Sequence, residues 1–139
     1  MKHEFPDLQA RYTHLVALLA PDKPRYGSQH GFPTSRTDDG SAHVELIDGK
    51  FNYVVTERGV EFDRRIALDE SEVLYWLLSS VTAAIASQFE LEHWIAGQDS
   101  RRQRFAKDVE LLGRMDPSWA ASKDLEYKQI LARYPFRDE

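Results

Sequence analysis

The feature that most constrains this chain is a long uncharged run in its middle, within Leu68–Trp94. Asp69 and Glu72 open this stretch with the spacing of a capping box, which satisfies the first free N–H groups of a helix. Between Val73 and Ser87 there is no charged residue, and the whole stretch contains neither glycine nor proline. A helix without a charged face over this length is normally buried on most of its sides, so we predict a central core helix. The side chains expected in the core are Leu74, Trp76, Leu77, Val81 and Ile85.

Ahead of this helix the hydrophobic residues recur at every second position, as they do in half-buried strands. Asp48-Gly49 and Arg58-Gly59 are tight-turn signals that divide residues 42–67 into a three-stranded antiparallel β-meander. If both turns are two-residue loops, the second hairpin pairs Val55 with Phe62, Tyr53 with Arg64, and Phe51 with Ile66. The predicted apolar face then consists of Val44, Leu46, Phe51, Tyr53, Val55, Phe62 and Ile66, with Arg64 as its one charge.

The remaining segments complete a single predicted domain over residues 1–139. Residues 1–20 carry a one-sided helical pattern, and residues 21–41 are rich in proline and glycine and are predicted as a loop. Residues 69–134 are predicted to form three helices, of which the central core helix is the first. The fold class is therefore α+β: an N-terminal helix, the meander with its apolar face on the central helix, and two further helices.

No set of residues in the sequence predicts a catalytic, cofactor or metal site. The chain has no cysteine, which excludes thiolate ligands and a disulfide framework. Glu90 and His93 have the Glu-x-x-His spacing of di-metal bundles, but such sites need the motif twice and only one copy is present. The serines of the central stretch do not follow a strand-to-helix elbow, and the glycines fit no phosphate-binding spacing. We therefore expect no enzyme activity, no cofactor and no metal.

Three arginines, at positions 101, 102 and 104, begin the helix after the central one, where the helix dipole disfavours positive charge. One interpretation is a small phosphate-ligand-binding protein or enzyme that uses Arg101 and Arg102 together with His93. The other is that Arg101 and Arg102 pair with carboxylates such as Glu92 or Asp99. We favour pairing, because the net charge is −5 and no aromatic residues interleave the cluster as they do in nucleic-acid binders.

A series of short runs from the first hairpin to the start of the last helix carries a family resemblance. The runs are Tyr53-Val-Val-Thr-Glu-Arg-Gly-Val-Glu61, Arg64-Arg65, Asp69-Glu70, Leu74-Tyr-Trp76, Val81-Thr82, Phe89-Glu-Leu-Glu-His93, Asp99-Ser-Arg-Arg-Gln-Arg-Phe105, Glu110-Leu-Leu112 and Asp116-Pro-Ser-Trp119. Together they resemble the immunity protein 63 family of bacterial polymorphic toxin systems. The resemblance implies a protein that binds a toxin in the cytosol and blocks it without catalysis or cofactors, but it assigns no functional residue by position.

The expected partner is thus a cognate toxin protein. We expect binding to neither nucleic acid nor a membrane, and the sequence does not predict the oligomeric state. We expect it to contact either the polar face of the sheet, through Glu45, Glu61 and Asp63, or the loop from Tyr26 to Arg36. Acidic residues there would steer a basic toxin, for example a nuclease. A cytosolic location also agrees with the first residues, which lack the apolar region of a signal peptide. A structural subunit of a larger complex is the remaining alternative.

Overall fold

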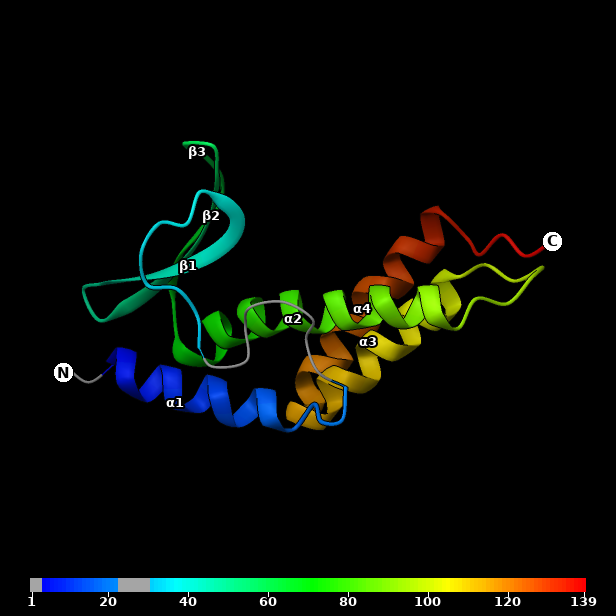
Figure 1. Cartoon of the computed structure of the whole chain (residues 1–139), viewed down its shortest axis with the longest axis horizontal. Helices are drawn as coiled ribbons and strands as arrows, with labels where there is room; N and C mark the ends of the chain where they lie inside the picture. The colour runs from blue at the N-terminus through cyan, green and yellow to red at the C-terminus, as the bar shows by residue number, and fades with distance from the viewer. Residues whose placement is uncertain (1–3, 23–30) are drawn as a thin grey trace. The chain divides into compact units, whose positions relative to one another are not determined.

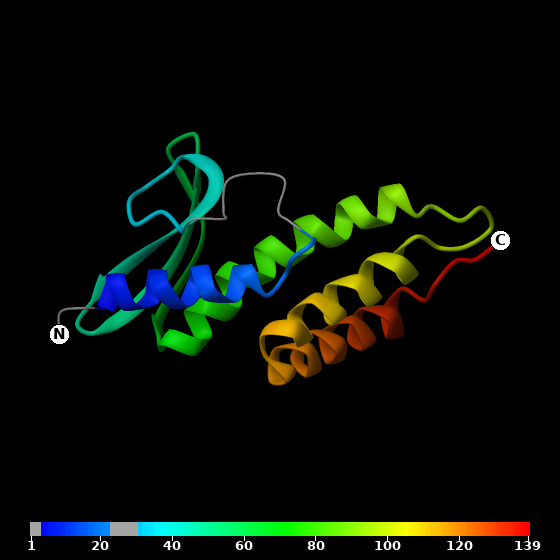
Figure 2. The same cartoon turned by 60° about the horizontal axis from the view of Figure 1, so that its bottom comes forward.

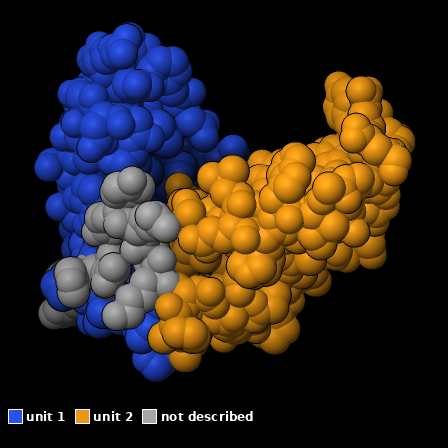
Figure 3. Space-filling model, turned by 45° about the vertical axis from the view of Figure 1, so that its right-hand side comes forward, with its two compact units in different colours: residues 1–17, 26–79 blue, residues 18–25, 80–139 orange. Residues whose placement is uncertain are grey.

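The computed structural model describes residues 4–22 and 31–139, and its contacts divide them between two compact units (Figure 3). Unit 1 comprises residues 1–17 and 26–79, and unit 2 comprises residues 18–25 and 80–139. The elements follow the predicted α+β order of one helix, three antiparallel strands and three helices (Figures 1 and 2). They are α1 (Glu4–Ala17), β1 (Asp39–Ile47), β2 (Lys50–Glu57), β3 (Val60–Leu68), α2 (Glu70–Glu92), α3 (Arg101–Met115) and α4 (Pro117–Arg133).

Helix α2 is the predicted core helix, and it contributes residues 70–79 to unit 1 and residues 80–92 to unit 2. The capping box forms as expected: the Asp69 N–H donates to Glu72 Oε1 at 2.9 Å, and the Glu72 N–H donates to Asp69 Oδ1 at 2.8 Å. One side of the helix remains exposed, along small residues at positions 80, 83, 84 and 87. Trp76 is half-buried, and the fully or nearly buried apolar residues are Val73, Leu74, Leu77, Leu78, Val81, Ile85 and Ala86.

The predicted register is confirmed for the first hairpin and wrong for the second. Val44 pairs with Tyr53 and Leu46 with Phe51, as predicted. On the second hairpin Tyr53 pairs with Arg65, Val55 with Asp63, and Phe51 with Leu68. The register shifts once between Val55 and Thr56 and again between Phe51 and Tyr53, and each shift places one extra residue in β3. The predicted pairs of Val55 with Phe62, Tyr53 with Arg64, and Phe51 with Ile66 therefore do not form.

These two β-bulges change which side chains face α1 and α2. Phe62 and Ile66, predicted to lie on the apolar face, are 65% and 64% exposed. Arg64 moves to the opposite face, beside Val54, and Arg65 replaces it on the helix side, where its guanidinium lies 3.7 Å from the centre of the Trp76 ring. Alternation alone cannot locate a bulge, since a strand with one extra residue keeps the same pattern on each side of it.

The helix-facing side of the sheet packs on aromatic residues of unit 1. The rings of Phe5 and Phe51 are 6.2 Å apart, and those of Tyr53 and Trp76 are 6.4 Å apart. These contacts connect α1 and the first turns of α2 to β2, the central strand of the order β1-β2-β3. The predicted packing of the meander on the core helix is therefore present, although β3 contributes Arg65 and Leu68 to it in place of Phe62 and Ile66.

The opposite face of the sheet, predicted as a polar face that could contact a partner, is covered at its centre. Its central side chains are buried, with Val54 at 0%, Thr56 at 1%, His43 at 4% and Asn52 at 7% exposure. The backbone N–H of Asp38 donates to Thr56 Oγ1 at 3.0 Å, so the segment leading into β1 contacts this face. A pattern of alternating residues shows which side chains share a face, but it does not show whether a distant segment will cover that face.

Only part of the predicted loop over residues 21–41 is described, and that part is anchored to α1. Gln9 holds Phe32 by both backbone groups: its amide nitrogen donates to the Phe32 carbonyl at 2.7 Å, and its Oε1 accepts from the Phe32 N–H at 3.0 Å. The Phe32 ring is buried and lies edge-on to Tyr12, 5.5 Å between centroids. Among the contact residues proposed from the sequence, Tyr26 lies outside the described residues.

In unit 2, α3 and α4 lie side by side (Figures 1 and 2). Asp116 caps α4 by accepting the Ser118 N–H at 2.8 Å, as the Asp116-Pro117 pair predicts. The rings of Phe105 and Tyr127 stack at 3.9 Å, and the Tyr127 hydroxyl donates to the buried Asp108 carboxylate. Burial and this hydrogen bond raise the pKa of Tyr127, so the phenol keeps its proton as a donor. Of the helices in residues 4–22 and 31–139, none is long and apolar enough to cross a bilayer.

Candidate functional site

The accessible part of the polar sheet face is a charged cluster that we call the rim cluster, formed by Glu45, Glu61 and Arg64. Arg64 on β3 reaches across β2 to β1, and its Nη1 donates to Glu45 Oε1 at 2.8 Å. Its Nε and Nη2 donate to the two carboxylate oxygens of Glu61 at 2.8 and 2.9 Å. The bidentate geometry fixes the planar guanidinium between two acids that lie far apart in the sequence.

The rim cluster changes the electrostatics of its members. The hydrogen bonds from Arg64 lower the pKa of Glu45 from its ordinary value of 4.5 to about 2, although partial burial acts in the opposite direction. Arg64 likewise lowers the pKa of Glu61. The two carboxylates in turn raise the pKa of Arg64, so all three groups are charged at neutral pH and the cluster carries one net negative charge.

Sequence reasoning missed the histidine beside this cluster. The His43 ring is 4% exposed, and its Nε2 lies 3.2 Å from Glu45 Oε2. In the described part of the chain, His43 Nδ1 is buried without a hydrogen-bond partner. Asn52 also supports Glu45, with its amide nitrogen 3.4 Å from Oε1. The alternation of residues places His43 on this face, but no local pattern shows that it is buried.

The predicted contact residues are only partly brought together. Glu45 and Glu61 share Arg64, whereas Asp63 pairs with Arg65 at 3.3 Å on the helix-facing side. Arg36 pairs with Asp38 at 2.8 Å, and the same carboxylate accepts the Gly59 N–H at the second turn. The acids proposed as a partner-binding surface thus lie on both outer strands and on both faces of the sheet, in pairs with arginines, and do not form a concentrated acidic patch.

The arginine cluster at the start of α3 fixes the C-terminal segment of unit 2. Arg101 pairs with Asp99 at 2.9 Å, as favoured from the sequence, and also donates to the carbonyls of Tyr134 and Pro135 at 3.0 and 2.8 Å. Its hydrogen bonds hold the pKa of Asp99 well below the usual range. Arg102 pairs with Asp138 at 2.6 Å, a partner that no local spacing could indicate. These arginines therefore have a structural use.

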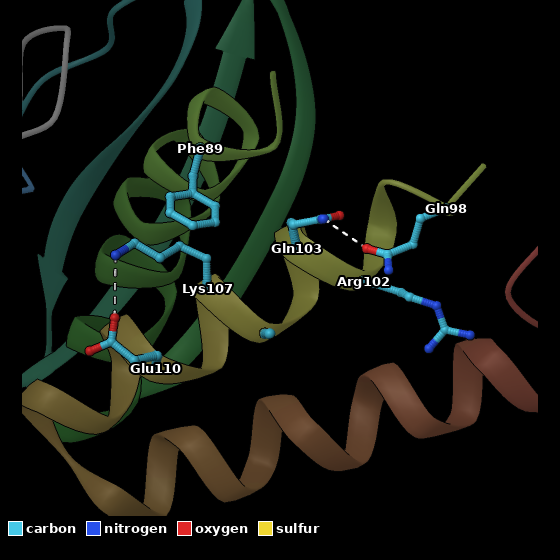
Figure 4. Close-up of a pocket in the computed structure, with 7 residues that line it drawn as sticks. Phe89, Gln98, Arg102, Gln103, Lys107 and Glu110 are labelled. Atoms are coloured by element: carbon cyan, nitrogen blue, oxygen red, sulfur yellow. Dashed lines mark hydrogen bonds and ion pairs between the residues drawn. The ribbon is translucent and has the colours of Figure 1, made fainter. Parts of the chain in front are cut away.

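An open hollow of about 460 Å³ lies beside α3 (Figure 4). Lys107 crosses it, with its ammonium 4.9 Å from the centre of the Phe89 ring and 3.2 Å from Asp22. Of the three groups that the ligand-binding interpretation requires, Arg102 lines the hollow, whereas Arg101 and His93 do not. The His93 ring instead stacks on Phe89 at 3.9 Å. The hollow is lined by Phe89, Gln98, Arg102, Gln103, Ala106, Lys107 and Glu110.

The charged groups of the hollow all have partners: Lys107 pairs with Glu110, as the dashed line shows (Figure 4), and Arg102 pairs with Asp138 outside the hollow. Glu110 also accepts from Arg114 at 2.6 Å, and this contact lowers its pKa. Within residues 4–22 and 31–139, no group of three His, Asp or Glu side chains is placed to hold a metal ion. The hollow thus brings together only one of the three groups that the ligand-binding interpretation names.

Comparison with known proteins gives one match. The family model described as immunity protein 63 matches residues 48–129, which is more than half of the chain. The matched segment contains β2, β3, α2, α3 and most of α4, and it includes Arg64 and Glu61 but not Glu45. A search of curated proteins and a search of solved structures each returned no match.

Proposed function

Because this chain belongs to the immunity protein 63 family, we propose that it neutralises a cognate toxin of a bacterial polymorphic toxin system by binding it directly in the cytosol. The family match carries this proposal. An immunity protein must block a toxin. It can do so by covering the active surface of the toxin, which requires only a stable surface of its own that is complementary to that of the toxin. On this proposal the chain is a stoichiometric inhibitor and does not catalyse a reaction.

The chemistry of the described side chains supports a binding role. The ion pairs of Arg64, Arg101 and Arg114 each join a guanidinium to a carboxylate. Catalytic sites usually hold titratable groups whose environments push their pKa values toward neutrality. Here the lowered pKa values of Glu45 and Asp99 lie further from neutrality, as expected for groups that serve as permanent charges.

We place the toxin-binding surface on unit 1, around the acids of the two outer strands, Glu45 on β1 and Glu61 and Asp63 on β3, with the segment around Arg36 as its neighbour. Unit 1 holds twelve acidic and seven basic residues, whereas unit 2 holds eleven of each, so the whole net charge of −5 belongs to unit 1. This asymmetry favours a basic toxin, because a negative surface speeds association with a positive partner.

The test is co-purification and protection. The chain is produced together with a candidate toxin domain, sought directly upstream of its gene, and we expect the two to elute as one complex and the cells to survive. An inactive toxin mutant is used as bait to measure binding separately from survival. The proposal fails if the toxin kills cells that contain an excess of this chain, or if survival occurs with no complex.

A further inference from the structure

Strand β3 is an edge strand that exposes large apolar side chains. Among the strands of residues 4–22 and 31–139, in the order β1-β2-β3, it has a neighbour on one side only. Phe62 and Ile66 are 65% and 64% exposed, although both would be core residues in an uninterrupted hairpin. Val60, at the start of the same strand, is also 53% exposed. Single exposed apolar residues are common on any surface, but three on one edge strand of an acidic unit require an explanation.

The two β-bulges cause the exposure of Phe62 and Ile66. Phe62 is the extra residue between Glu61, which pairs with Thr56, and Asp63, which pairs with Val55. Ile66 lies in the second bulge, between Arg65 and Leu68. Bulges at sheet edges re-aim side chains, and here the chain places Leu68 opposite Phe51 in the core while Ile66 remains in water.

The second bulge is held in place by a dedicated contact. Ala67 has a φ of 59°, in the left-handed region that a residue with a Cβ adopts at a cost of about 1 kcal/mol. The buried Asn52 stabilises this conformation, since its Oδ1 accepts the Ala67 N–H at 3.1 Å. A strained backbone that exposes an apolar side chain lowers stability, and such features cluster at functional sites.

The bulges also determine how a partner can use this edge. Only Asp63–Arg65 lie between them in regular pairing, which is too short for an added strand to extend the sheet. A partner therefore meets side chains and not a continuous row of backbone groups. The charges beside the two apolar residues are neutralised, Glu61 by Arg64 and Asp63 by Arg65, so little charge needs to be desolvated around them.

We propose that Phe62 and Ile66 are the anchors through which unit 1 docks into an apolar recess on the cognate toxin, within a toxin surface that is basic. The proposal rests on the proposed function and specifies its contact surface. The apolar pair slows dissociation once buried, because a few fully desolvated side chains dominate an interface. The net charge of −5 on unit 1 speeds the encounter with a positively charged surface, so a basic toxin surface fits this edge best.

The test measures binding of the purified full chain to a catalytically inactive form of the toxin domain encoded beside its gene. Phe62→Ser and Ile66→Thr are each expected to weaken binding by about 30-fold or more, mainly through faster dissociation. Trp94→Ser is the matched control, because Trp94 is equally exposed at 65% but belongs to unit 2. It should bind as the unaltered chain does. Urea unfolding verifies that each variant is folded, and the association rate should fall as salt is raised.

The outcomes separate this inference from the proposed function. An unaltered chain that does not bind the toxin contradicts the proposed function. Tight binding of the unaltered chain, with Phe62→Ser and Ile66→Thr binding equally well, overturns the anchor assignment alone. A loss of affinity in Trp94→Ser without one in the β3 variants also overturns it and moves the contact to unit 2. If the free chain is a dimer that Phe62→Ser dissociates, a second copy occupies this edge and the assignment to the toxin is wrong.

Discussion

Replacing Arg64 with methionine tests whether the rim cluster stabilises the fold, because methionine retains the unbranched stem and removes the charge. The pKa of Glu45 is lowered from 4.5 to about 2 chiefly by Arg64, and a difference of that size corresponds to roughly 3 kcal/mol. The Glu45 and Arg64 side chains are 30% and 35% exposed, so solvent screens part of this energy. We expect Arg64→Met to lower the free energy of unfolding by about 1–2 kcal/mol at pH 7.

The pH dependence gives the sign of this effect. Because the folded pKa of Glu45 lies below its unfolded value, the stabilisation is fully present above pH 4.5 and is lost as the pH falls toward 2. Urea unfolding of the unaltered chain should therefore show falling stability in this window, and Arg64→Met should show less of this decline. For both the unaltered chain and Arg64→Met, the urea midpoint is measured at intervals from pH 7 to pH 2.

A double-mutant cycle with Glu45→Gln isolates the pair. The coupling energy between Arg64→Met and Glu45→Gln should be about 1–2 kcal/mol at pH 7 and should disappear near pH 2. Arg133→Met, which removes an exposed charge on α4, controls for the change in net charge. A coupling near zero at pH 7 would refute the reasoning, since the pair would then be a solvated surface contact with no effect on Glu45.

Two further predictions concern the packing of unit 1. Leu78→Ala should lower the free energy of unfolding by about 2–5 kcal/mol, because Leu78 is fully buried on α2. Leu91→Ala is the control and should change this free energy little, because Leu91 is 71% exposed. Equal effects of the two substitutions would contradict the assigned core. Gly31→Ala should be more destabilising than Gly49→Ala in thermal unfolding. Both glycines have a positive φ, but a Cβ at Gly31 would lie 2.6 Å from Gln9 Oε1 and disrupt the clamp on Phe32, whereas at Gly49 it meets nothing within 4 Å. A smaller loss at Gly31 would show that the clamp adds no stability.

The sequence predicted correctly those parts of the fold that depend on residues close together in the chain. The capping box at Asp69 and Glu72, the uncharged core helix and the first hairpin each depend on residues a few positions apart. The predicted register of the second hairpin was wrong because its bulges are stabilised by contacts between residues far apart in the sequence. One of them is the hydrogen bond from the Ala67 N–H to the buried Asn52. A register chosen to maximise one apolar face assigns Phe62 and Ile66 to the core.

The candidate site follows the same division. Glu45 and Glu61 were assignable to a polar face from their positions in the strands. Their shared partner, Arg64, could not be assigned to the same face, because a register shift of one residue moves it from one face of the sheet to the other. The partner of Arg102 is Asp138, 36 residues away, which spacing within a helix could not indicate. The acids predicted as partner contacts are instead paired with Arg64 and Arg65, and local spacing does not identify these pairs.

The most direct test of direct, non-catalytic neutralisation is a titration of toxin activity with the purified chain. We predict that activity falls linearly and ends at one chain per toxin molecule, at protein concentrations well above the dissociation constant. The same mixture should contain a 1:1 complex by size-exclusion chromatography with light scattering. Full inactivation by a small fraction of an equivalent, increasing with time, would contradict the account, because it would show that this chain modifies the toxin catalytically.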